Sequence, residues 1–197
     1  MALEGFPQDV TLRDGTVVTV RPMKAEDGPG LLEFFRSLPD EDRLFLKEDV
    51  TRPETIDRFV KGLNYDSVIP LLAFHEGRIV GDATLHRRSG WSKHVGEIRM
   101  VVARAFQKKG LGAALAKSLV GLALNLGLDK LVAEVTDHQI GARKAFEKIG
   151  FRQEAVLKDH VKDILGSKRD LVLMTNDVSH IWESLQALAE EYLPTVE

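Results

Sequence analysis

Two glycines separated by one residue stand directly before an apolar helical run, in the stretch FQKKGLGAAL (residues 106–115). A helix that begins here leaves its first four amide groups without partners and carries a partial positive charge at that end. Glycine has no Cβ, so a phosphate can approach these amides closely. Gln107, Lys108 and Lys109, with Arg104 before them, add donors and positive charge. The stretch predicts an anion site, and the bound anion would offset the cost of glycine in a helix, about 1 kcal/mol.

A purely structural interpretation stays open, in which the two glycines only form a tight turn from strand to helix. Two other phosphate motifs are excluded by their spacing. A P-loop needs four residues between its glycines and a Lys-Ser/Thr pair after the second, and both are absent. A dinucleotide fingerprint needs a third glycine where Leu115 stands.

Composition narrows the class of protein. The chain has 197 residues, is 44% hydrophobic and 29% charged, and carries a formal net charge of −3. These values are typical of a globular domain and do not favour binding to nucleic acid or to an anionic membrane. The chain has no cysteine, which excludes disulfides, thiolate metal sites and a cysteine nucleophile. The histidines show no metal-ligand spacing. We expect a cytoplasmic protein, since neither a signal peptide nor a membrane span is recognisable.

The elements that must hold the glycines alternate between strand and helix patterns, which predicts a single α/β domain over residues 1–197. Strands are expected on both sides of Asp14-Gly15, at a type I′ turn, and then at 68–74, 78–86, 94–102, 130–136, 151–157 and 169–175. Residues 158–168 form a polar stretch between the last two. Helices are expected at 31–38, 53–63 with Thr51 as a possible cap, from about Gly110, at 140–150, and in an amphipathic C-terminal segment, 177–197.

Residues 102–113, VARAFQKKGLGA, resemble the acyl-CoA signature of the GNAT family of N-acetyltransferases, Q/R-x-x-G-x-G/A after a strand. A second block, QIGARKAFEKIGF (residues 139–151), resembles the family's helix-strand block N-x-x-A-x-x-L-Y-E-K-x-G-F. It departs from that pattern at Gln139, where Asn is usual, and at Phe146, where Tyr is common. Residues 12–38 show a weaker likeness to the acetyltransferase domain of bacterial protein-lysine acetyltransferases.

The resemblance implies a central, mostly antiparallel mixed sheet with helices on both faces, splayed between its fourth and fifth strands. It also implies acetyl-CoA as co-substrate and no metal. The pantetheine arm would pair with the backbone near residues 100–103, and the pyrophosphate would lie on the amides of residues 109–113. The residues expected to bind CoA are Val101, Val102, Ala103, Gln107, Lys108, Lys109, Gly110, Leu111, Gly112, Ala113 and Gln139.

Glu97, on the strand that leads into the glycines, is the expected catalytic base. An amine of pKa about 10.4 must lose a proton before it attacks, which costs roughly 4.6 kcal/mol at pH 7. The apolar neighbours of Glu97 are expected to raise its pKa, and the family often places a catalytic glutamate on this strand. The alternatives are a solvated edge carboxylate or a partner for Arg99. Phe146 cannot donate the proton that a Tyr would give to the leaving thiolate, and its helical spacing favours a role in the core.

The expected function is direct transfer of an acetyl group, in a ternary complex, to a primary amine such as a protein lysine. An acetyltransferase of a small amine or amino acid and a catalytically silent acyl-CoA sensor remain alternatives. The partners expected are therefore an amine acceptor, with no nucleic acid or membrane, and possibly a second copy of the chain. The C-terminal stripe of Ile181, Trp182, Leu185, Leu188 and Tyr192 would either cover the core or form that homodimer.

Overall fold

An eight-stranded mixed sheet forms the centre of the computed structural model, which describes residues 3–44, 46–163 and 165–191. Its strands are β1 (Gln8–Thr11), β2 (Val17–Pro22), β3 (Val68–His75), β4 (Arg78–Arg87), β5 (Val95–Val102), β6 (Lys130–Thr136), β7 (Arg152–Lys162) and β8 (Lys168–Asp177). They lie in the order β1-β2-β3-β4-β5-β6-β8-β7, and only the β5–β6 pair is parallel. The predicted mixed, mostly antiparallel sheet is confirmed.

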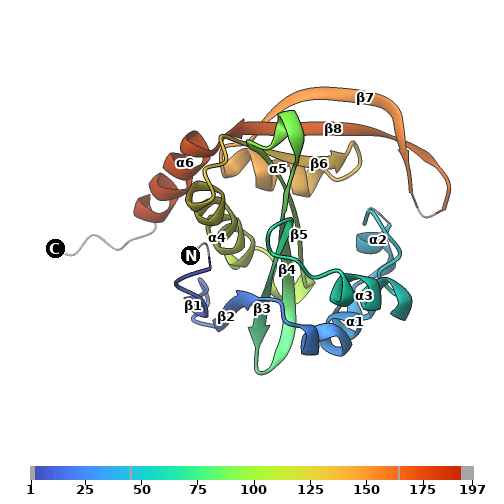
Figure 1. The fold of residues 1–197 in the computed structure, drawn as a ribbon, viewed down its shortest axis with the longest axis vertical. Coiled ribbons are helices and arrows are strands. Elements are labelled where there is room, and N and C mark those ends of the chain that lie inside the picture. The colour runs from blue at the N-terminus through green and yellow to red at the C-terminus, as the bar shows by residue number, and fades with distance from the viewer. Residues whose placement is uncertain (1–2, 45, 164, 192–197) are drawn as a thin grey trace.

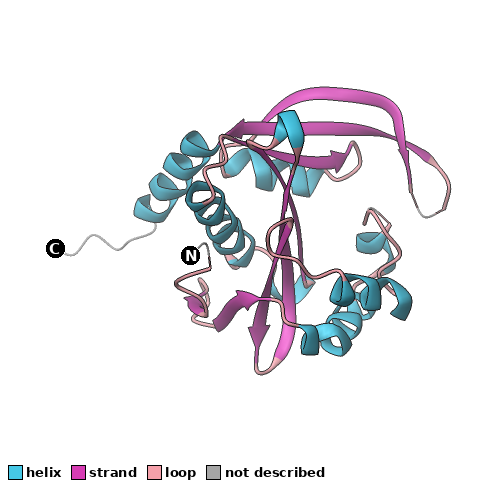
Figure 2. Cartoon of the chain, viewed as in Figure 1, coloured by secondary structure: helices cyan, strands magenta, loops and turns pink. Residues whose placement is uncertain are grey.

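The sheet separates between β5 and β6. Their pairing covers only Val95–Glu97 against Lys130–Val132, whereas β4 and β5 pair from Gly81 opposite Val102 to Arg87 opposite Gly96. Figure 2 shows the consequence: β3, β4 and β5 run in one direction and β6, β8 and β7 run across it. In this chain's own count the separation therefore lies between the fifth and sixth strands, one strand later than expected.

Helices cover both faces of the sheet, as predicted. They are α1 (Gly28–Ser37), α2 (Asp40–Arg43), α3 (Pro53–Lys61), α4 (Leu111–Asn125), α5 (Ile140–Lys148) and α6 (Val178–Glu191). Leu111, Leu115 and Leu119 of α4 are buried with Ile98 of β5 in the larger core cluster. The smaller cluster joins α1 and α3 to the opposite face of β3 and β4. Figure 1 shows α4 on one side of β4 and β5 and the α1–α3 group on the other.

Three local expectations are wrong. At Asp14-Gly15 only the glycine has a positive φ (+83°), and the Gly15 amide donates to the Leu12 carbonyl at 2.9 Å, so the hairpin has a longer loop than a type I′ turn. Thr51 does not cap α3, because its hydroxyl donates to Asp49 Oδ1 at 2.6 Å. The polar stretch 158–168 continues β7 and begins β8, and this long hairpin curves outward in Figure 1. Helix α2 was not predicted.

The C-terminal helix uses its apolar stripe inside the chain. Ile181 and Leu185 are buried in the larger core cluster, and Trp182 lies beside Gly121 of α4. Tyr192 and the side chain of Leu188 lie outside the described residues. Covering the core is therefore the role that the structure supports for this stripe, while homodimerisation through it stays a prediction. No helix in the described ranges combines the length and apolar character that crossing a bilayer requires.

Candidate functional site

The glycine turn, residues 107–113, joins β5 to the beginning of α4. Gly110 precedes the helix with φ +100°, a left-handed conformation that favours glycine. The Ala114 amide donates to the Gly110 carbonyl at 3.0 Å, so the amides of Leu111, Gly112 and Ala113 come before the first helical hydrogen bond. A Cβ added at Gly112 would meet no atom within 4 Å. Contacts within the chain therefore account for Gly110 but not for Gly112.

Lys108 also adopts a left-handed backbone, with φ +60°. Such a conformation strains a residue that has a Cβ, and strained residues concentrate at functional sites. Lys108 is exposed, whereas Lys109 is half-buried and pairs with Asp14 of the β1–β2 loop at 2.9 Å. The hydrogen bond from Lys109 lowers the pKa of Asp14 to about 2. Of these two lysines, Lys108 is the exposed cation at the glycine turn, while the charge of Lys109 is paired with Asp14.

Two of the expected donors have other partners. Arg104 donates from Nε to Asp42 Oδ2 at 2.9 Å and also bonds Glu41, so its guanidinium is held at α2. Gln107 donates from Nε2 to the Val102 carbonyl at 3.0 Å and so braces the end of β5. Neither contact could be foreseen, because α2 was not predicted and a side chain that returns to its own strand leaves no sequence pattern.

The edge of β5 that faces β6 is open beyond Glu97. Within the described part of the chain, no strand pairs with residues 98–102 on this side. Val101, Val102 and Ala103 lie here and are half-buried, and the Ala103 amide already donates to the Val80 carbonyl at 2.9 Å. This open edge leads directly into the glycine turn, so the expected CoA-binding residues 101–103 and 107–113 lie along one stretch of chain, in which the side chain of Leu111 is buried in the core.

An ion cluster of Lys47, Glu97, Arg99 and Glu134 lies where β5 and β6 part. Glu97 is 8% exposed and accepts hydrogen bonds from Lys47 Nζ at 2.6 Å and Arg99 Nε at 2.7 Å. Lys47 Nζ also donates to Glu134 Oε2 at 2.5 Å. Burial acts to raise the pKa of Glu97, but the hydrogen bonds from Arg99 and Lys47 outweigh it and lower the pKa to about 2. The expected upward shift is wrong, and pairing with Arg99 is confirmed.

Three polar side chains of β4 share this face of the sheet: Asp82, Thr84 and His86. His86 stands opposite Glu97 in the strand register, and its Nε2 lies 3.0 Å from Thr84 Oγ1. Burial and the nearby Arg99 cation lower the pKa of His86 to about 4, while burial raises the pKa of Asp82 to about 7. Sequence reasoning missed both groups as part of a site. The signal was present, since polar residues recur at every second position of this strand.

In the second block that resembles the family, residues 139–151, Gln139 and Phe146 both have structural roles. Gln139 precedes α5 and accepts from the Thr136 amide at 2.8 Å, which holds the end of β6. Phe146 is buried and packs edge to face on Phe151, with ring centroids 5.2 Å apart. The core role of Phe146 is confirmed, and Gln139 is not brought into contact with the glycine turn by any interaction described here.

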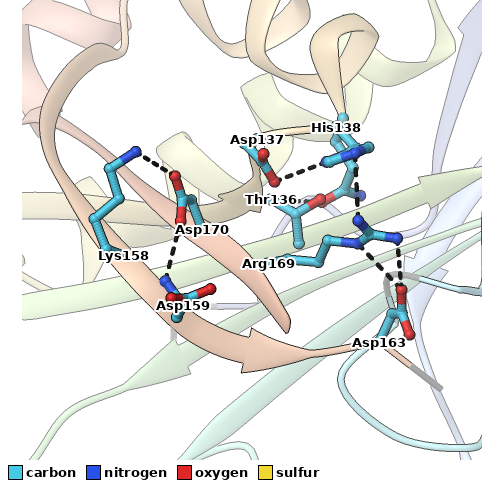
Figure 3. A network of polar contacts seen from close by, with 9 residues as sticks. Thr136, Asp137, His138, Lys158, Asp159, Asp163, Arg169 and Asp170 are labelled. Carbon is cyan, nitrogen blue, oxygen red and sulfur yellow. Dashed lines mark hydrogen bonds and ion pairs between the residues drawn. The ribbon is translucent and has the colours of Figure 1, made fainter. Parts of the chain in front are cut away.

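A polar network ties the β7–β8 hairpin to the loop before α5 (Figure 3). Arg169 donates to Asp163 at 3.1 Å, and its Nη1 lies 3.4 Å from His138 Nε2, while His138 Nδ1 lies 2.8 Å from Asp137. His138 is exposed. Among the residues that the structure describes, no group of three or more His, Asp or Glu side chains could hold a metal ion.

Comparison with known proteins gives one family. The model of the acetyltransferase (GNAT) family matches residues 32–151, more than half of the chain. Solved structures with the same fold include the GNAT domain of S. lividans PAT, at 22% identity and a TM-score of 0.74 over 86% of this chain and 96% of that one. Mycobacterium smegmatis RimJ, solved with CoA-disulfide, has 19% identity and a TM-score of 0.76 over 94% and 96%. The putative acetyltransferase yncA from Salmonella typhimurium, solved with acetyl-CoA, has 20% identity and a TM-score of 0.69 over 82% of this chain and 94% of that one.

Proposed function

The chain belongs to the acetyltransferase (GNAT) family, and we propose that it transfers an acetyl group from acetyl-CoA directly to a primary amine. One observation carries the proposal: the unpaired amides of the glycine turn, with open space at Gly112, adjoin the free edge of β5 where the sheet separates. Backbone amides at a helix N-terminus suit a diphosphate, and a free strand edge suits the amide groups of a pantetheine arm.

The residues present fit acetyl-CoA. The amides of residues 109–113 would hold the pyrophosphate, with Lys108 beside them, and the backbone of Val101 and Val102 on the open edge would bond the pantetheine arm, since the Ala103 amide already bonds Val80. The space beside Gly112 fits this use, because a glycine in the first turn has no packing reason in the chain itself. Acetyl-CoA, when bound, supplies an acetyl thioester, whose thiol leaves readily because its pKa is near 8.5. Because such a thiolate can leave without a proton from the protein, the site needs no proton donor at the position of the buried Phe146.

We assign Glu97 as the catalytic base that serves the acceptor amine. Its carboxylate is buried where the two strands part, and it would take the proton that the attacking amine must lose. A carboxylate with a pKa of about 2 is a weak base, but one of the two cations that lower this value is Lys47, on a segment far from β5 in sequence. When the amine beside Glu97 is neutral, whether it is Lys47 or an acceptor in its place, only Arg99 still lowers the pKa of Glu97, so the pKa rises from about 2.

The acceptor that we propose is the side chain of a protein lysine. Support comes from the ion cluster, in which a lysine ammonium already fits between the carboxylates of Glu97 and Glu134. The structural likeness to the PAT GNAT domain agrees with this choice but shows the fold alone. A small amine would need the same two carboxylates, so it is the alternative that the experiment must separate.

Two measurements on the purified chain test the proposal. Calorimetry with CoA and acetyl-CoA measures binding, and a thiol reagent measures release of CoA when lysine peptides, small amines and amino acids are offered. The proposal predicts binding together with thiol release, fastest with lysine peptides. Binding with no thiol release from any amine would indicate a sensor module instead, and no binding at all would refute the proposed function.

A further inference from the structure

We propose that Lys47 is itself an acetyl acceptor: with acetyl-CoA bound, the chain acetylates the ε-amine of this residue within the same molecule. The inference rests on the proposed function and adds a modification site to it. It starts from the position of one atom. Lys47 Nζ lies 2.6 Å from Glu97 Oε1, the group assigned to accept the proton of the acceptor amine, and 2.5 Å from Glu134 Oε2.

The amine lies at the point where the sheet opens. Glu97 pairs with Val132 in the last register position of β5 against β6, and Glu134 follows two residues later on β6. Both carboxylates lie on the face opposite α4, because their neighbours Ile98, Ala133 and Val135 are buried in the cluster that contains α4. Lys47 therefore spans the two diverging strands from the side of α1 and α3, beside the open edge of β5.

The segment that carries Lys47 is anchored next to it. Val50 is 6% exposed in the smaller core cluster, and Arg36 of α1 donates from Nε to the Thr51 carbonyl at 3.0 Å. Glu48 forms an ion pair with Arg58 of α3. A lysine held in this way is presented at a fixed place, and a reactant held at the reacting site has a high effective concentration. The side chain of Lys47 is 35% exposed, so it is not sealed away from a second substrate.

The reaction balances with acetyl-CoA alone. Lys47 loses one proton to Glu97, and its nitrogen lone pair then forms a bond to the thioester carbonyl carbon. The bond between that carbon and sulfur breaks, and the electron pair leaves with sulfur. The nitrogen loses a second proton, so that one proton makes the CoA thiol and the other passes to solvent. The product is an Nε-acetyl-lysine, which is neutral and can no longer form an ion pair with Glu97 and Glu134.

Peptide mass spectrometry tests the transfer. The full chain is incubated with isotopically labelled acetyl-CoA, and labelled acetyl is followed at Lys47 and at Lys61, an exposed lysine at the end of α3 that serves as an internal control. We expect Lys47 to be labelled at least about tenfold faster than Lys61, at a rate per molecule that dilution of the protein does not change. Glu134→Gln is expected to slow Lys47 by about tenfold and leave Lys61 and CoA affinity unchanged.

A second readout needs no acetyl-CoA. Limited reaction with acetic anhydride reports how freely each amine can be reached by a small reagent. We expect Lys47 to react about tenfold more slowly than the exposed Lys61, because its nitrogen must first give up its hydrogen bonds to Glu97 and Glu134, and we expect Glu134→Gln to reduce that difference. Equal reactivity of the two lysines in the wild-type chain would overturn the placement of Lys47 between the carboxylates, and the proposal with it.

The outcomes separate the two proposals. If CoA binds and external amines release its thiol, but Lys47 is labelled no faster than Lys61, the internal acceptor is wrong and the proposed function stands. If the rate at Lys47 falls on dilution, one molecule acetylates another and the internal transfer is refuted. If CoA does not bind, both proposals fail. Lys47→Arg, which keeps the charge, must remove the labelled site without removing CoA binding.

Discussion

The glycine turn and the ion cluster lie at the two ends of the same open strand edge, yet they are built in opposite ways. The glycine turn consists of seven consecutive residues, 107–113, and offers mainly backbone amides. The ion cluster brings Lys47 together with Glu97, 50 positions later, and with Glu134, 87 positions later, and it consists of side chains. A site for an anion can be written into a local stretch of chain, whereas a site for a cation here depends on packing.

The two regions also differ in charge, and this difference matches the two binding roles that we propose for them. Amides and lysines at the glycine turn suit a diphosphate, while the carboxylates of the ion cluster suit an ammonium group. Because the two ends attract ligands of opposite sign, each substrate has one end at which it can bind. Substitutions should therefore affect either CoA binding or acceptor chemistry, and seldom both.

Glu97→Gln should give the largest effect. Loss of the proton acceptor is expected to lower kcat by about 10³-fold with lysine peptides, while the Kd for CoA changes by less than about twofold. Stopped-flow or steady-state thiol release and calorimetry measure the two quantities. Asp82→Asn, on the neighbouring strand, tests the competing assignment of the base. If it lowers kcat more than Glu97→Gln does, the base is Asp82, whose pKa near 7 suits that role.

Gly112→Asp tests the other end. The new carboxylate would occupy the open space where we place the pyrophosphate, so we expect the Kd for CoA to rise at least about 100-fold, or about 2.7 kcal/mol. Asn125→Asp, which puts the same charge at the far end of α4, should leave the Kd unchanged. Calorimetry provides both values. An unchanged Kd for Gly112→Asp would place the pyrophosphate elsewhere.

Asp82→Asn should also change the dependence of stability on pH. Burial raises the pKa of Asp82 from 3.8 to about 7, so its contribution is fully present below pH 3.8 and is lost as the pH rises through 7. The Tm of Asp82→Asn relative to wild type should therefore be about 10 °C more favourable at pH 8 than at pH 4. The exposed Asp129→Asn serves as control in the same thermal scans. A difference in Tm that stays constant with pH would contradict the raised pKa.

Arg104→Ala should have the smallest effect on CoA. Its guanidinium is held by Glu41 and Asp42 at α2, so we expect the Kd to change by less than about twofold. Lys108→Ala, in the strained part of the glycine turn, should weaken binding more. If calorimetry finds the reverse order, Arg104 leaves α2 when CoA binds, and the separation between the two regions is less complete than the structure indicates.

Much of the fold could be predicted because strand and helix periodicities repeat over many residues. The strands at 68–74, 78–86, 94–102 and 130–136 and the helix after Gly110 all lie within a few residues of the predicted positions. The turn at Asp14-Gly15 could not be predicted, because several loop lengths accept this pair. The extension of β7 to Lys162 was also missed, since pairing between two strands stabilises polar residues that have no apolar pattern.

In the candidate site, the glycine turn could be predicted from the sequence, but the ion cluster could not. Residues 107–113 determine by themselves a left-handed Gly110 and a helix that begins with unpaired amides, because backbone geometry depends on near neighbours. Only the tertiary structure decided that Lys47 meets Glu97 and Glu134, that Arg104 turns to α2, and that the pKa of Glu97 falls instead of rising. The reason is physical: a pKa follows the charges and burial around a group, and those come from segments that folding brings together.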